Sequence, residues 1–189
     1  SLASGRTRVV AVVAPFLTRW FFATLVSAIE KSLRAQGHHV ILCGLEDDTY
    51  GQRLTLTQNM LWKRVDGIIT LNVPMTAEEV ELVDRLERPL VAIGSPVPGR
   101  ACVRIDDRLA LRTAVQHLAD LGHTKVGYIG SVPDNVAHIQ TPQDRLEAFK
   151  ASVVEFGLTC EPAWILNSDW TAEAAAQDSR DLLRGDDRP

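Results

Sequence analysis

Short runs of β-branched and other apolar residues alternate along this chain with longer segments of helical periodicity. Most of these runs are apolar at successive positions, which is typical of strands in a parallel sheet that helices cover on both faces. The pattern predicts strands at residues 8–15, 39–45, 66–71, 89–94, 101–105, 125–130 and, with the weakest pattern, 163–166.

Apolar residues spaced at i, i+3, i+4 and i+7 fill the segments between these strands. The spacing predicts helices over 22–33, 111–118 and 146–156, and weaker patterns predict helices over 50–63, 76–87 and 171–184. Thr76 and Glu79 have the spacing of a capping box at the start of one helix. Helices are expected to end at Gly37, Gly122 and Gly157, because glycine readily adopts the left-handed conformation that closes a helix.

The alternation of strands and helices predicts an α/β fold with doubly wound parallel sheets. Ligands bind such sheets beyond the carboxyl ends of the strands. Residues 131–144 follow the strand predicted at 125–130, and they are polar and without periodicity. We therefore expect a long functional loop over 131–144.

The strands are distributed unevenly along the chain. Five of them precede Leu121, which is enough for one sheet, and only two follow it. A two-stranded sheet has too little apolar surface to cover itself. We therefore predict an N-terminal lobe over residues 8–121 and an incomplete second lobe over residues 122–189. Residues 1–7 are expected to be a linker or a remnant of an expression vector.

Composition and charge narrow the class of protein. The chain has 189 residues, of which 46% are hydrophobic and 23% charged, as expected of a globular protein. Its net charge of −4 argues against nucleic-acid binding by this segment itself. There is no apolar run long enough to cross a bilayer and no secretory signal at the start, and the three cysteines lie far apart. We expect a cytoplasmic protein that does not bind membranes, with a processed periplasmic protein as the alternative.

Enzymes and metal proteins leave signatures that this sequence lacks. The first strand–helix junction, APFLTRWFF, has no glycine-rich turn for a dinucleotide, and there is no G-x-S-x-G nucleophile motif. No pair of cysteines has zinc spacing, and the adjacent His38 and His39 would point to opposite faces of a strand. We predict no catalytic residue, no cofactor and no metal. An enzyme on a flavodoxin-like sheet is the alternative from a different class.

Four motifs in a fixed order resemble a known family. They are Phe21-Phe22, KRVDGIITL (63–71), HLADLGHTKVGYIG (117–130) and RLEAF (145–149). Together they resemble the effector-binding core of the lactose/galactose repressor family, over essentially the whole chain. The resemblance implies two Rossmann-like lobes, as in periplasmic binding proteins, with a sugar or nucleoside-like effector between them. It also implies a homodimer that binds DNA only through an N-terminal helix-turn-helix, which these residues do not include. A periplasmic sugar-binding protein of a transporter shares the fold and is the alternative.

The resemblance implies four polar contacts to the effector. Asp106 matches an acid that accepts hydrogen bonds from effector hydroxyls, and Arg145 matches an arginine that binds the effector from the second lobe. Thr141 and Asn72 match further polar contacts. The residues alone leave alternatives open, since Asp106 immediately precedes a predicted helix and is suited to cap it. Arg145 would also suit a solvated first turn.

The resemblance implies aromatic contacts as well. Phe21 and Phe22 match aromatic residues that line the effector site after the first strand, and Trp170 matches an aromatic residue on which the ligand stacks. Aromatic faces pack against the C–H side of a sugar ring. The residues alone favour a core position for Phe22, because it begins the apolar stripe of the first helix.

The sequence also departs from the family pattern near the proposed site. Phe16 stands where many members have Asp or Ser, and Arg19-Trp20 stands where they often have Asn-Pro. Ala148 replaces the glycine of the RLxGF motif. Phe16 is included among the expected effector-binding residues. These changes imply larger and more apolar side chains at the mouth of the pocket than is usual in the family. Trp20 and Trp62 are expected to be packing or dimer contacts.

Overall fold

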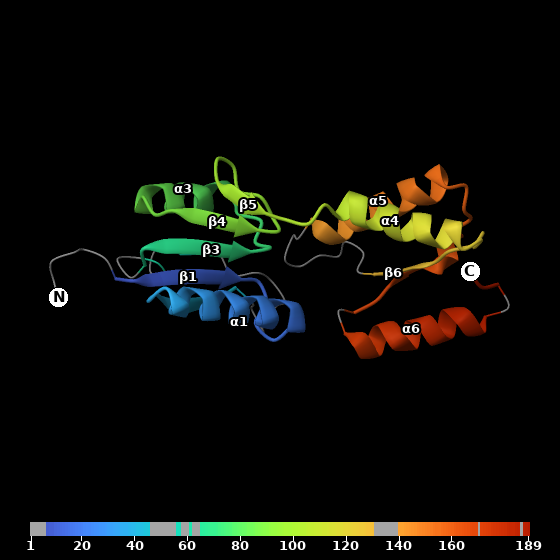
Figure 1. Ribbon diagram of the computed structural model, residues 1–189, viewed down its shortest axis with the longest axis horizontal. Coiled ribbons are helices and arrows are strands. Elements are labelled where there is room, and N and C mark those ends of the chain that lie inside the picture. The colour runs from blue at the N-terminus through green and yellow to red at the C-terminus, as the bar shows by residue number, and fades with distance from the viewer. Residues whose placement is uncertain are drawn as a thin grey trace. The chain divides into compact units, whose positions relative to one another are not determined.

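The computed structural model describes residues 7–45, 56–57, 61, 65–130, 140–169, 171–185 and 187–189. The chain forms two compact units. Unit 1 contains the described residues up to Arg104, and unit 2 contains those from Ile105 onward. Figure 1 labels the elements of both units.

Unit 1 is built on one five-stranded sheet in which all pairs of neighbouring strands are parallel. The strand order is β2-β1-β3-β4-β5, which confirms the doubly wound sheet expected from the sequence. The strands are β1 (Val9–Ala14), β2 (His39–Gly44), β3 (Gly67–Leu71), β4 (Leu90–Ile93) and β5 (Ala101–Val103).

Helices pack on both faces of this sheet, and β1 shows why its residues are apolar in succession. Ala11 and Val13 belong to the same buried cluster as Leu82 and Val83 of α3 (Ala77–Leu86). Val12 and Ala14 belong to a second cluster, with Phe22 of α1 (Trp20–Ala35). Figure 1 shows α1 beside β1 and α3 beside β4. Because successive strand residues point to opposite faces, both faces of β1 are buried.

The predicted capping box starts α3. The Glu79 backbone N–H donates to Thr76 Oγ1 at 3.3 Å, and the Thr76 N–H donates to Glu79 Oε2 at 2.9 Å. Glu79 is buried, and its other carboxylate oxygen, Oε1, accepts from the Leu56 N–H at 2.7 Å. One carboxylate therefore satisfies backbone donors of two segments.

Thr76→Ala should lower the free energy of unfolding by about 1 kcal/mol, because it removes the side-chain acceptor at the N-cap. Urea denaturation followed by circular dichroism measures the change. Thr76→Ser is the matched control, since it keeps the hydroxyl and should stay close to the parent protein. Equal losses in the two variants would show that the hydroxyl does not stabilise the helix.

Thr7 belongs to the folded part of unit 1, although a linker is predicted for residues 1–7. Its backbone N–H donates to Asp66 Oδ1 at 3.0 Å, and the Arg8 N–H donates to Asp66 Oδ2 at 2.7 Å. These hydrogen bonds, that from Thr7 foremost, lower the pKa of Asp66. The carboxylate thus fixes the entry of the chain into β1.

Unit 2 contains a two-stranded parallel sheet, three α-helices and one 3-10 helix among its described residues. Its elements are α4 (Asp107–Asp120), β6 (Tyr128–Gly130), α5 (Thr141–Glu155), the 3-10 helix η1 (Pro162–Trp164), β7 (Ile165–Asn167) and α6 (Ala172–Arg184). The core of unit 2 forms where α4 and α5 pack together beside β6, and it contains Val115, Val126, Phe149 and Val153.

The boundary between the units differs from the predicted one. The first lobe is predicted to extend to residue 121, whereas α4 lies in unit 2. The reason is the apolar face of α4, where Val115 is buried in the cluster that also holds Phe149 of α5. Counting strands therefore placed the boundary one helix too late.

Trp164 is the largest fully buried side chain of unit 2, at 2% exposure. Its indole Nε1 donates to the Asp187 carbonyl oxygen at 3.1 Å, which attaches the segment after α6 to the unit. Its own carbonyl oxygen lies 3.1 Å from the position that a Cβ on Gly127 would occupy. The backbone before β6 thus passes Trp164 at a distance that leaves little room for a larger residue at 127.

Gly37, Gly122 and Gly157 all have positive φ, as expected of glycines that close helices. Most of the helix expected over 50–63 lies outside the described residues, and so does Trp62. The loop expected over 131–144 ends earlier, because α5 begins at Thr141 with Pro142 in its first turn, where proline is favourable. No helix in the described part of the chain is long and apolar enough to span a membrane.

Candidate functional site

Aromatic side chains gather at the carboxyl end of β1 in unit 1. Phe16 and Phe22 meet edge-on with ring centroids 5.8 Å apart, and Phe22 meets Phe21 in the same way at 5.3 Å. The Arg19 guanidinium lies 3.6 Å from the centroid of the Phe16 ring. Phe22 is buried in the core, as the residues alone favour, whereas Phe21 and Trp20 are exposed. Three phenylalanines are predicted to bind the effector, and of these Phe16 and Phe21 have accessible surface.

Asn72 follows β3 at the same edge of the sheet. It has a φ of 52°, a left-handed conformation that asparagine tolerates better than most residues. Ser95 Oγ donates to Asn72 Oδ1 at 3.4 Å. Gly94 has a φ of 86°, and a Cβ there would lie 2.1 Å from Asn72 Oδ1. Asn72 therefore occupies a defined position at the end of β3, and Gly94 is the residue that leaves room for it.

Asp106 caps α4. Its Oδ1 accepts a hydrogen bond from the Leu109 N–H at 3.0 Å, and it belongs to unit 2. The expectation that Asp106 and Arg145 belong to opposite lobes is therefore wrong, because α4 packs with α5. The capping role that the residues alone suggested for Asp106 is confirmed.

Arg145 lies in α5 and binds the neighbouring carboxylate instead. Its Nε donates to Asp107 Oδ1 at 2.7 Å, which links α5 to the first residue of α4. The side chain of Arg145 is 41% exposed and that of Asp107 is 20% exposed. A guanidinium has five N–H donors, so this ion pair leaves others available to a ligand.

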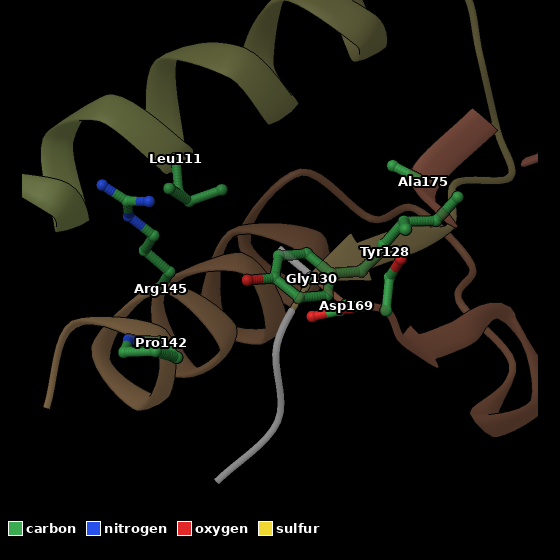
Figure 2. Close-up of a pocket in the computed structure, with 9 residues that line it drawn as sticks. Leu111, Tyr128, Gly130, Pro142, Arg145, Asp169 and Ala175 are labelled. Atoms are coloured by element: carbon green, nitrogen blue, oxygen red, sulfur yellow. The ribbon is translucent and has the colours of Figure 1, made fainter. Parts of the chain in front are cut away.

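A pocket of about 340 Å³ opens beside Arg145 within unit 2. It lies at the carboxyl ends of β6 and β7, where ligands bind parallel sheets. Figure 2 shows Arg145 and Pro142 on α5, with the Tyr128 ring extending toward them from β6. The described residues that line it are Leu111, Tyr128, Ile129, Gly130, Pro142, Arg145, Ser168, Asp169 and Ala175.

The Tyr128 ring is held across the end of β6. It packs against Phe149, with ring centroids 5.0 Å apart. A Cβ on Gly130 would lie 2.6 Å from the Tyr128 ring and 2.7 Å from its hydroxyl oxygen, so the ring passes directly over this glycine. Burial raises the pKa of Tyr128, and the carboxylate of Asp107 adds to this while the charge of Arg145 opposes it. The phenol is therefore neutral at pH 7 and able to donate a hydrogen bond.

Tyr128, Ser168 and Asp169 are pocket residues that sequence reasoning missed. Ser168 and Asp169 directly follow β7, so the rule for the carboxyl ends of strands was the available signal. The strand has only three residues, which is too few for a clear pattern. Thr141 is the first residue of α5 and does not line the pocket, and Trp170 lies outside the described residues.

The thiols of Cys43 and Cys160 are poorly suited to nucleophilic chemistry. Burial raises the pKa of the Cys43 thiol and, with a contribution from Glu161, that of Cys160. Thiols of this kind are protonated at pH 7 and weakly nucleophilic. Across the described ranges, no three His, Cys, Asp or Glu side chains are grouped as a metal site requires.

Parallel sheets with a partly apolar pocket at their carboxyl ends define the class of α/β small-molecule-binding domains. The profile of one such family, described as periplasmic binding proteins and sugar binding domain of the LacI family, matches residues 7–187. The chain belongs to this family, and the resemblance drawn from the four motifs is confirmed.

Individual relatives agree with this assignment. Catabolite control protein A of Priestia megaterium is 30% identical over 194 residues, which cover 100% of this chain and 56% of the relative. The HTH-type transcriptional repressor PurR of Photobacterium profundum is 26% identical over 192 residues, with the same two shares. The chain thus spans about half the length of these curated relatives.

A solved structure shows the fold. The LacI family transcriptional regulator from Enterococcus faecium, solved with bound ribose, matches with a TM-score of 0.74 at 24% identity. The match covers 94% of this chain and 64% of that one.

Proposed function

We propose that this chain is the effector-binding core of a transcriptional regulator, and that it senses a small sugar or similar polyol. The observation that carries the proposal is the pocket of unit 2, where Arg145, Tyr128 and Ser168 bring polar groups to the ends of two parallel strands. The ribose bound to the regulator from Enterococcus faecium supports a sugar as the ligand class. Arg145 is proposed as the main polar contact in this pocket.

The role is proposed to be binding rather than catalysis, in the cytoplasm and as a homodimer. The names of the curated relatives are those of a control protein and a repressor, which favours gene regulation over a periplasmic transport role. The net charge of −4 fits a DNA contact made by residues outside this chain. Effector binding would then change DNA affinity through different affinities for two conformations of the protein.

A thermal-shift screen tests the proposal. Ligands that bind only the folded form raise the melting temperature, by an amount that grows with concentration relative to Kd. D-ribose, D-glucose, D-galactose, cellobiose and adenosine are suitable probes, with L-proline as an unrelated small solute. A concentration-dependent rise with at least one sugar or nucleoside is expected. A flat response to all of them would contradict the proposed function.

A further inference from the structure

Ser168 carries a hydroxyl that the described fold does not use. The residue is 7% exposed, and its Oγ has no hydrogen-bond partner among the described residues. Its backbone is held in place, since the Ser168 N–H donates to the Gly130 carbonyl oxygen at 2.9 Å. A buried hydroxyl without a partner destabilises a fold, because it has lost its hydrogen bonds to water and formed none within the protein.

The buried serine of α5 behaves differently. Ser152 is also buried, and its Oγ donates to the Ala148 carbonyl oxygen at 2.7 Å. Thr70 in unit 1 has a buried Oγ1 without a partner in the described part of the chain, but it lies in β3 and does not line the pocket. Ser168 combines a buried unpaired hydroxyl with a position on the pocket wall.

We propose that the hydroxyls of Ser168 and Tyr128 form the hydrogen-bonding end of this pocket and bind hydroxyl groups of an uncharged polyhydroxylated ligand. This proposal rests on the proposed function and names the residues that select the ligand. A single rotatable bond positions Ser168 Oγ, and no hydrogen bond among the described residues fixes it. The hydroxyl can therefore turn toward a ligand without breaking an existing hydrogen bond. Tyr128 contributes from the neighbouring strand, with its ring supported by Phe149.

The charges around the pocket favour an uncharged ligand. Arg145 is the only cation among the described lining residues, and its Nε already binds Asp107 at 2.7 Å. Asp169 places a carboxylate on the lining itself. A phosphate group would meet one partly neutralised cation and a carboxylate, so these charges favour an uncharged sugar over a phosphorylated one.

The first measurement needs no ligand. Ser168→Ala removes an unpaired buried hydroxyl, so the melting temperature of the whole chain should rise by about 2–4 °C. Ser152→Ala is the matched control, because it removes a paired hydroxyl and should not raise the melting temperature. An unchanged or lower melting temperature for Ser168→Ala would overturn the proposal, since the hydroxyl would then have a partner.

The second measurement is calorimetric titration with D-ribose, D-glucose, D-galactose and D-ribose 5-phosphate. Ser168→Ala and Tyr128→Phe should each weaken binding of the preferred sugar by about 2- to 13-fold, the loss of one neutral hydrogen bond. Thr70→Val should raise the melting temperature without weakening binding, because its hydroxyl lies away from the pocket. D-ribose 5-phosphate should not bind.

The outcomes separate this inference from the proposed function. If a sugar binds the parent protein and both hydroxyl variants equally well, the inference fails and the proposed function stands. If D-ribose 5-phosphate binds as tightly as D-ribose, the uncharged ligand class is wrong. If none of the four probes binds, these hydroxyls do not bind such ligands, whatever the melting temperature of Ser168→Ala.

Discussion

Replacing Trp164 by alanine should lower the free energy of unfolding by about 3–5 kcal/mol, the usual cost of truncating a buried aromatic side chain. The side chain is 2% exposed, so the variant leaves a cavity that the surrounding helices and strands fill only in part. It also loses the hydrogen bond from the indole to the Asp187 carbonyl. Urea denaturation followed by far-ultraviolet circular dichroism measures the loss, because the substitution removes a fluorophore.

Trp20→Ala is the matched control for this prediction. Trp20 is 75% exposed and contacts Phe21 edge-on with ring centroids 6.2 Å apart. Its removal should change the free energy of unfolding by less than about 1 kcal/mol. If both tryptophan variants lost the same stability, burial of Trp164 would not be what stabilises unit 2.

Arg145→Ala should weaken binding of the sugar identified by thermal shift by about 10- to 150-fold. The reason is the loss of a charge-assisted hydrogen bond, which contributes about 1.5–3 kcal/mol. Stability should fall by no more than about 1 kcal/mol, because the ion pair with Asp107 is partly exposed to solvent. Calorimetric titration gives the affinity and thermal melting gives the stability.

Arg112→Ala is the control for the loss of an ion pair between helices. Arg112 Nη2 donates to Glu155 Oε1 at 2.6 Å, so this pair also joins α4 to α5. Arg112 does not line the pocket. Its replacement should leave the sugar affinity unchanged, and equal affinity losses in the two variants would refute the role assigned to Arg145.

The sheet of unit 1 was predictable from the sequence because its signals are local. Each of its strands is a short apolar run between turns, and their alternation with helices predicts a parallel sheet. The strand order, by contrast, depends on pairings between distant residues such as Val10 and Gly67. The capping box at Thr76 and the cap at Asp106 are equally local, since donor and acceptor are three residues apart. The limits of unit 1 were harder to predict, because only packing shows that α4 belongs with α5.

The pocket depended on contacts between distant residues and was therefore found only in part. Arg145 followed from the RLEAF motif, but its ion pair with Asp107 joins residues 38 positions apart. Ser168 has no feature in the sequence that separates it from a surface serine, and only its burial and missing partner do so. Tyr128 was assigned to a strand without a role, because its contact with Gly130 depends on how the ring turns along β6.

The close passage of the Tyr128 ring over Gly130 limits how this protein can be redesigned as a biosensor. A side chain at position 130 would occupy the volume of the Tyr128 ring. The ring can therefore keep its position only while residue 130 is glycine. Variants in which only Gly130 is replaced would displace the Tyr128 ring. A change of ligand preference would require residues 128 and 130 to be mutated together. A residue smaller than tyrosine at 128 would make room for a side chain at 130.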